Sequence, residues 1–270
     1  MIFVSIYTIM STMSLHNDLK LKQLYQLLPK EVVVSASWLE QNGVSRQLRY
    51  KYLQSEWLHT VGKSAYIINP QSFTWEGLLI GIQQFVKLSY HIGGLKALEL
   101  QGFAHYLPIG NENKITLYGT KNLPAWLKNL NIDYKLVLQK KPYYDSIGLK
   151  SFSSNIKDYD LKVSSPERAI FELLYLVEKD GISFGFVSEI FEGLTTLRPN
   201  IINELLQECE SKKVKRLFVF FMEYFNHPWN KFIEIDNIDM GTGKMQIVKG
   251  GTLNKKYLIT IPKDYTSESK

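Results

Sequence analysis

The chain has 270 residues and a net charge of +6, from 32 Lys and Arg against 26 Asp and Glu. Its 45% hydrophobic and 13% aromatic content excludes intrinsic disorder and a collagen-like chain. The single cysteine, Cys209, excludes an internal disulfide and a thiolate zinc cluster, and it predicts a reducing, cytoplasmic environment. The length fits one large domain or two of ordinary size, and the basic balance is compatible with a nucleic-acid ligand.

The first 13 residues, MIFVSIYTIMSTM, form an apolar run that ends in small polar residues. A signal peptide begins with positive charge, but the first lysine of this chain is Lys20. A membrane helix needs about 20 apolar residues, and this run is shorter. Residues 1–13 are therefore a weak hydrophobic anchor or an extension from a start codon assigned too early, and we favour the extension. No other segment of the sequence approaches membrane length, so we expect no membrane partner.

Residues 14–72 contain the pattern of a helix-turn-helix. Ser35 or Ser37 can cap a short helix, and Gly43 can end that helix in a left-handed conformation. Ser45 can then cap a second helix two residues later. Two short helices joined by a glycine turn are typical of this motif.

The second of these helices has an apolar and a polar face. Its apolar stripe, at i, i+4 and i+8, is Val44, Leu48 and Tyr52. At 100° per residue the side chains expected outside this stripe are Arg46, Gln47, Arg49 and Tyr50. Such a face can hydrogen-bond base edges and phosphates in a major groove. An ordinary solvated helix face is the alternative.

Residues 56–69 predict two short strands around Gly62-Lys63. A hairpin directly after the second helix is the wing of a winged helix, and Lys63 at its tip can reach a phosphate. Between Val44 and Lys63 four basic residues stand against one acid, Glu56. The segment is therefore predicted to bind DNA, through the candidate residues Ser45, Arg46, Gln47, Arg49, Tyr50, Lys51 and Lys63.

The remaining sequence predicts a second, larger domain. We expect a linker helix over 73–89, a mixed α/β C-terminal domain over 90–265 and a polar tail over 266–270. Helices are expected at 95–100, from Ser165-Pro166 onward, at 201–210 and at 214–225, and strands at 114–118, 134–138, 245–248 and 257–261. The predicted fold class is α+β, an N-terminal winged helix-turn-helix followed by a larger mixed α/β domain.

A second group of basic residues lies immediately before the helix at 214–225. It consists of Lys212, Lys213, Lys215 and Arg216. These side chains can contact a phosphate backbone or an acidic partner. Alternatively, they close the C-terminus of the preceding helix, where cations are favourable. The pattern leaves both interpretations open.

Possible catalytic motifs are incomplete. Asp158 and Asp160 are spaced like the metal pair of a nucleotidyltransferase, but no Gly-Ser segment lies shortly upstream. Glu210 and Lys212 are spaced like the Glu-x-Lys of a nuclease, but no suitable acidic strand accompanies them. The five histidines are scattered, so no metal site is predicted. We expect no catalytic residue and no cofactor, with a metal-dependent nuclease or nucleotidyltransferase as the alternative.

The chain resembles the AbiEi-type antitoxins, the regulator half of bacterial type IV abortive-infection toxin–antitoxin systems. The matching segments are GVSRQL at 43–48, EWL at 56–58, ALELQG at 97–102, SPERA at 165–169, LLQECESKKVKRLF at 205–218, HPW at 227–229, DMGTGK at 239–244 and the closing 250–262. The similarity covers roughly residues 13–265. Two positions depart from the family: Glu56 stands where glycine is often found, and Met245 where a basic residue is common.

The resemblance implies a repressor of its own operon that also counteracts a nucleotidyltransferase-like toxin encoded beside it. In that family the winged helix binds inverted repeats in the promoter duplex, and the C-terminal domain carries the antitoxic activity. The antagonism is described for the family as indirect, without a stable toxin–antitoxin complex. These expectations come from the resemblance alone.

Overall fold

A computed structural model describes residues 20–103, 114–123, 126–127, 134–139, 146–156 and 158–266. The expected N-terminal extension, 1–13, and nearly all of the expected polar tail lie outside this range. The chain forms two compact units, each with helices and a sheet, which confirms the α+β class. The N-terminal unit comprises residues 1–90, 121–134 and 151–161, and the C-terminal unit comprises 91–120, 135–150 and 162–270. The chain therefore passes between the units several times, whereas the sequence predicted two consecutive domains joined by a linker helix over 73–89.

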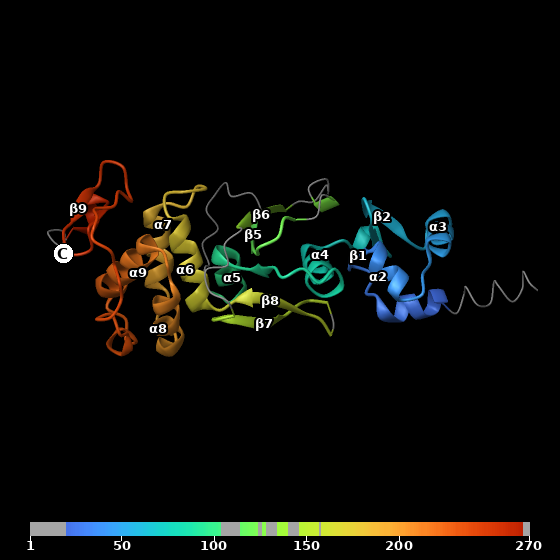
Figure 1. Cartoon of the computed structure of the whole chain (residues 1–270), viewed down its shortest axis with the longest axis horizontal. Helices are drawn as coiled ribbons and strands as arrows, with labels where there is room; N and C mark the ends of the chain where they lie inside the picture. The colour runs from blue at the N-terminus through green and yellow to red at the C-terminus, as the bar shows by residue number, and fades with distance from the viewer. Residues whose placement is uncertain are drawn as a thin grey trace, which may run out of the picture. The chain divides into compact units, whose positions relative to one another are not determined.

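The first part of the N-terminal unit is a winged helix (Figure 1). A helix over 20–27 precedes β1 (Val34–Ser35), α2 (Ala36–Gln41), α3 (Arg46–Gln54), β2 (His59–Gly62) and β3 (Ala65–Ile67). The three strands form an antiparallel sheet in the order β1-β3-β2. Thus the predicted helix-turn-helix and its wing are both present.

The predicted linker helix is a buried part of the same unit. It consists of α4 (Trp75–Ile80), preceded by a 3-10 turn at Pro70–Ser72 and continued by a π-helical turn, Gly81–Phe85. A Cβ atom on Gly77 would stand 2.1 Å from the Glu31 carbonyl oxygen, and one on Gly81 2.1 Å from that of Val33. The two glycines therefore allow this helix to pack directly against the backbone before β1.

Two later segments of the chain complete the N-terminal unit. The Asn155 side-chain amide donates to Glu76 Oε1 at 2.9 Å, and the Gln84 amide donates to the Asp160 carbonyl at 2.6 Å. Trp126 packs so closely against the wing that a Cβ on Gly62 would lie 2.7 Å from its own Cβ. Residues 121–134 and 151–161 are thus structural parts of the unit that carries the winged helix.

The C-terminal unit begins with most of a five-stranded sheet in the order β6-β5-β4-β8-β7. The strands are β4 (His91–Ile92), β5 (Lys114–Tyr118), β6 (Lys135–Gln139), β7 (Leu149–Ser153) and β8 (Asp160–Ser164). β4 is antiparallel to β5 and parallel to β8, and β5 is parallel to β6. The helix α5 (Gly94–Leu100) follows β4 directly. The expected strands at 114–118 and 134–138 are therefore confirmed, the second one shifted by one residue.

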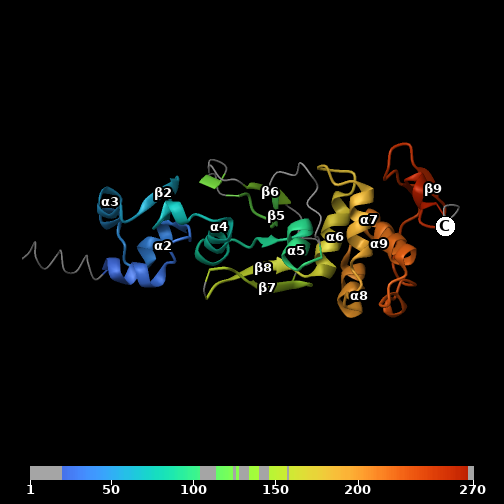
Figure 2. The same cartoon turned by 180° about the vertical axis from the view of Figure 1, so that it is seen from behind.

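A group of packed helices follows the sheet (Figures 1 and 2). It contains α6 (Pro166–Leu176), α7 (Phe184–Glu192), α8 (Pro199–Glu208) and α9 (Lys212–Phe225). α9 is buried nearly all round, and the rings of Phe218 and Phe221 each lie 5.4 Å, centre to centre, from the ring of Phe191. The unit closes with a 3-10 turn (Asn230–Phe232), the hairpin β9 (Thr252–Asn254) and β10 (Ile259–Ile261), and η5 (Lys263–Tyr265). The expected strand 245–248 is wrong, because only Met245 forms a single bridge, to Ile259.

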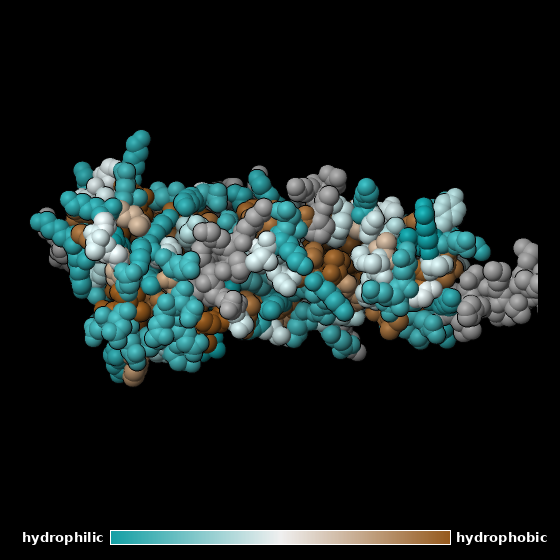
Figure 3. Space-filling view, in the orientation of Figure 1, coloured by the Kyte–Doolittle hydropathy of each residue, from teal (hydrophilic) through white to brown (hydrophobic). Residues whose placement is uncertain are grey.

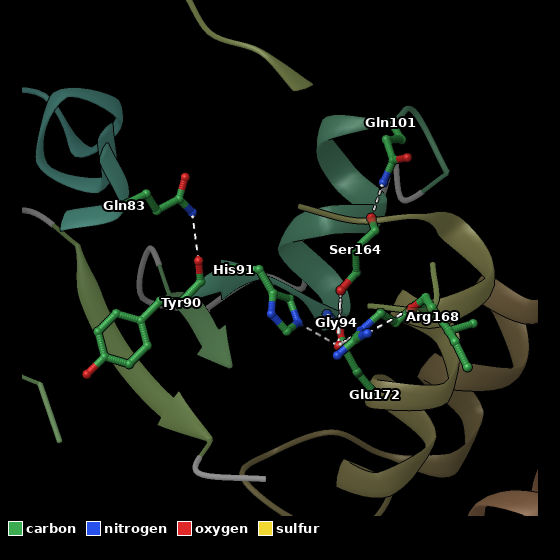
Figure 4. A network of polar contacts seen from close by, with 9 residues as sticks. Gln83, Tyr90, His91, Gly94, Gln101, Ser164, Arg168 and Glu172 are labelled. Carbon is green, nitrogen blue, oxygen red and sulfur yellow. Dashed lines mark hydrogen bonds and ion pairs between the residues drawn. The ribbon is translucent and has the colours of Figure 1, made fainter. Parts of the chain in front are cut away.

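A buried carboxylate joins the sheet to the helices of this unit (Figure 4). Glu172 on α6 accepts hydrogen bonds from Arg168 Nε at 2.9 Å, from the Ser164 hydroxyl at 2.8 Å and from the Gly94 amide at 2.9 Å. His91 Nε2 lies 2.9 Å from the same carboxylate. Arg168 and Glu172 are 0% and 1% exposed, so this network is buried and stabilises the packing of the sheet on the helices.

Candidate nucleic-acid interface

The start of α3 is fixed by the residues that the sequence pattern singled out. Gly43 has φ +83°, the left-handed conformation that ends α2. The Ser45 hydroxyl accepts a hydrogen bond from the Leu48 amide at 3.3 Å, and the Ser35 hydroxyl caps α2 through the Trp38 amide at 3.2 Å. These caps set where each helix begins, and so which side chains of α3 face outward.

The outward face of α3 carries polar side chains without a hydrogen-bond partner in the described part of the chain. Val44, Leu48 and Tyr52 are buried, as predicted. Tyr50 is 63% exposed. The other exposed candidates on this helix and its cap are Ser45, Arg46, Gln47 and Lys51. Apart from the Ser45 cap, these side chains make no hydrogen bond or ion pair within the part of the chain that the structure describes, so their donors remain available to a ligand.

Arg49 does not belong to this face. Its side chain is buried, and its guanidinium donates to Glu40 Oε1 at 3.0 Å and to the Ala36 carbonyl at 3.4 Å. The same guanidinium lies 5.3 Å from the centre of the Tyr66 ring. The expected outward orientation of Arg49 is therefore wrong, because this residue ties α3 to α2 and to the wing.

The wing presents Lys63 to solvent. Lys63 and Ser64 connect β2 to β3 and are exposed, with Ser64 at φ 65°. Within the described residues the Lys63 ammonium has neither an ion pair nor a hydrogen bond. At the start of the wing Glu56 has φ 56°, a left-handed conformation that glycine adopts without strain.

One exposed residue of α3 was missed by the sequence analysis. Gln54 ends the helix, is exposed, and at 100° per residue falls between Tyr50 and Gln47 on the same face. The helical spacing that selected Tyr50 identifies Gln54 as well, one turn further on. Its amide can both donate and accept, as base recognition requires.

The second basic group is not a free cationic patch. Lys212 forms an ion pair with Asp239, and Lys213 donates to the Tyr175 and Val177 carbonyls at 3.1 and 2.5 Å. Lys213 therefore closes the C-terminus of a helix, as the second interpretation proposed, but that helix is α6 and not the preceding α8.

The other two cations of this group are buried. Lys215 is 6% exposed and Arg216 2%. Arg216 donates to the carbonyls of Met240 at 2.7 Å and Gly243 at 2.6 Å. A phosphate-binding role for this group as a whole is thus wrong, because Arg216 holds the loop around 240–243.

The HPW segment at 227–229 and the SPERA segment at 165–169 make structural contacts within the C-terminal unit. The His227 Nε2 atom lies 2.9 Å from the Phe191 carbonyl, and the Trp229 indole donates to the Leu194 carbonyl at 2.8 Å. Ser165 precedes α6 as predicted, but its hydroxyl donates to Glu167 at 2.6 Å and makes no cap hydrogen bond. Cys209 is buried at the end of α8. His227 and Trp229 therefore hold the segment after α9 against α7 and the residues that follow α7.

The described residues contain no group of three or more His, Cys, Asp or Glu arranged to hold a metal. None of their helices combines the length and the apolarity that a bilayer crossing requires. On the face of the molecule in Figure 3, hydrophobic residues appear only as small separate areas among hydrophilic ones.

A capped helix with free Arg, Gln and Tyr donors, followed by a hairpin with a lysine at its tip, defines a winged-helix regulator. Comparison with known families agrees. Residues 17–109 match the model of the AbiEi antitoxin N-terminal domain, and residues 112–262 that of the transcriptional regulator, AbiEi antitoxin, of type IV toxin–antitoxin systems. The chain therefore belongs to the AbiEi antitoxin family of transcriptional regulators.

A solved structure supports the fold. The crystal structure of the RV2827C protein from Mycobacterium tuberculosis is similar over 88% of each chain, with a TM-score of 0.56 and 13% sequence identity. At this identity the similarity shows the fold alone. No curated protein matches the chain.

Proposed function

We propose that this antitoxin represses its own operon by binding inverted repeats in duplex DNA through α3 and the wing. The observation that carries the proposal is the outward face of α3, where Arg46, Gln47 and Tyr50 have no partner within the described chain. Arg46 and Gln47 lie in the first turn of the helix, the part of a recognition helix that contacts base edges. We assign phosphate contacts to the exposed side chains of Lys51 and Lys63 and to the start of α3 at Ser45.

The experiment is fluorescence anisotropy with a promoter fragment as the labelled duplex. Arg46→Ala is expected to weaken promoter binding about 5- to 150-fold, the range that corresponds to losing one bidentate base contact. Lys63→Ala is expected to weaken binding to all duplexes alike and to reduce the slope of log affinity against log salt by about 1.

The matched control is Lys30→Ala, which removes an exposed positive charge of the same unit outside α3 and the wing. If Lys30→Ala weakens binding as much as Arg46→Ala does, net charge and not the α3 face governs affinity. In that case the recognition surface is assigned wrongly.

The second part of the proposal is that the protein counteracts a nucleotidyltransferase-like toxin in the cytoplasm, without catalysis and without a stable complex. Its support is membership of the antitoxin family, whose regulator model matches residues 112–262. Co-expression with the toxin encoded beside it is expected to restore growth, and Arg46→Ala is expected to leave this rescue intact. Loss of rescue in that variant would contradict separable functions. Metal-dependent turnover by the purified antitoxin would contradict a non-catalytic role.

A further inference from the structure

A pocket of roughly 500 Å³ lies in the C-terminal unit. One wall comes from α7, a second from the last residues of α9, and a third from η5. The sequence motifs do not include this pocket, and the proposed regulator function does not use it.

The rim of this pocket is anionic. Glu189 and Glu192 on α7 and Asp264 on η5 line it, and all three are exposed. The described lining residues include no Lys or Arg, and no ion pair within the described chain engages these carboxylates. Glu192 and Phe225 are the last residues of α7 and α9, so the negative ends of two helix dipoles lie at the same place. The pocket therefore favours a cation.

Its walls are aromatic. The Tyr265 ring lies 5.3 Å from the Tyr224 ring and 5.1 Å from the Phe184 ring, centre to centre. Tyr224 and Phe225 meet edge to face at 5.0 Å. Tyr224, Phe225 and Tyr265 are partly exposed along the pocket. Aromatic faces beside carboxylates attract a cation through both the ring quadrupole and direct charge.

The floor holds a polar group that points to a ligand. Ser188 lines the pocket and is 2% exposed, yet its hydroxyl makes no hydrogen bond within the described chain. A ligand that donates N–H groups would supply one for Ser188 and for the carboxylates together.

We propose that this pocket receives the guanidinium of an arginine side chain presented by a partner polypeptide. A guanidinium is planar, so it can stack on a tyrosine face, and its five N–H donors match carboxylates in a bidentate arrangement. An ammonium is more strongly hydrated and lacks the planar surface, which makes it the weaker fit to these aromatic walls.

The test uses the full-length, ¹⁵N-labelled protein, titrated with N-acetyl-arginine methylamide and observed by NMR. The matched neutral ligand is N-acetyl-citrulline methylamide, which keeps the shape of the side chain and removes its charge. Amide signals of Ser188, Glu192 and Tyr265 are expected to shift and saturate with the arginine compound. Citrulline is expected to bind at least about fivefold more weakly.

Glu189→Gln combined with Glu192→Gln is expected to weaken arginine binding about fivefold. Glu204→Gln combined with Glu208→Gln, the same charge change on exposed residues of α8, is expected to leave it unchanged. If the citrulline compound binds as tightly as the arginine compound, the pocket is not a cation site. If the α8 double variant weakens arginine binding as much as the α7 double variant, net charge and not the pocket explains the effect. Tighter binding of spermidine than of the arginine compound would overturn the assignment to a guanidinium.

Discussion

Substitution of Arg49 tests most directly whether a residue of α3 contributes to stability or to DNA recognition. In the structure its guanidinium pairs with half-exposed Glu40, donates to the Ala36 carbonyl and lies 5.3 Å from the Tyr66 ring centre. The ion pair, the long hydrogen bond and the cation–π contact are each worth about 0.5–1 kcal/mol in such partly exposed settings, and the buried stem adds packing. Arg49→Ala is therefore expected to lower the free energy of unfolding by about 2 kcal/mol, or Tm by about 4–8 °C.

The assay is thermal unfolding followed by circular dichroism, paired with promoter binding well below the melting range. Arg46→Ala is the matched control, because it removes the same side chain from the exposed face of α3. It is expected to change the free energy of unfolding by less than about 0.5 kcal/mol while weakening promoter binding. The reasoning is refuted if Arg49→Ala melts like the wild type and loses promoter affinity as Arg46→Ala does, since Arg49 would then face DNA.

Three further outcomes follow from backbone strain and buried charge. Glu56→Gly is expected to stabilise the protein by about 0.5–1 kcal/mol in urea unfolding, because φ 56° strains a residue that has a Cβ. The control is Gly43→Ala, which is expected to destabilise the protein. Gly43 has φ +83° and no atom within 4 Å of an added Cβ, so only backbone strain acts there. Burial alone would raise the pKa of Glu172, but the contacts with His91 and Arg168 outweigh burial and lower this pKa. The network therefore stabilises the fold at pH values above the ordinary pKa of 4.5. This stabilisation is lost as the pH falls through the lowered pKa. Glu172→Gln is expected to lower the free energy of unfolding by about 3–5 kcal/mol at pH 7 and to flatten the dependence of Tm on pH between 7 and 3. A decrease below about 1 kcal/mol would contradict a stabilising role of the Glu172 network. Burial and the charge of Lys179 lower the pKa of Lys213 to about 8, so an NMR titration of its side chain should have its midpoint there, and a midpoint near 10.5 would contradict the half-buried site.

The winged helix could be predicted because its signals are local. Ser35, Gly43 and Ser45 act within four residues of themselves, and the stripe from Val44 to Tyr52 repeats at the helical period. The orientation of the Arg49 side chain could not be predicted from these local signals. At 100° per residue it lies about 60° from buried Tyr52 and about 60° from exposed Arg46, so the period alone is undecided. Glu40, on a different helix, decides the orientation.

The second basic group shows the same limit over a longer distance. The carbonyls that hold Arg216 belong to residues 24, 27 and 42 positions later, and those that hold Lys213 to residues 38 and 36 positions earlier. No spacing rule connects such pairs. The sequence did contain one usable signal, since a helix that is apolar nearly all round buries the cations on it too, and they must then find acceptors.

The scattered make-up of the N-terminal unit has a consequence for its synthesis. The wing ends at Ile67, but Asn155 and Asp160, which bind Glu76 and Gln84, emerge more than 80 residues later. At a translation rate of about 5–20 residues per second, the ribosome needs roughly 5–20 s to supply them. For that time the nascent DNA-binding unit lacks its closing segments, so the complete unit can form only after much of the chain has been made.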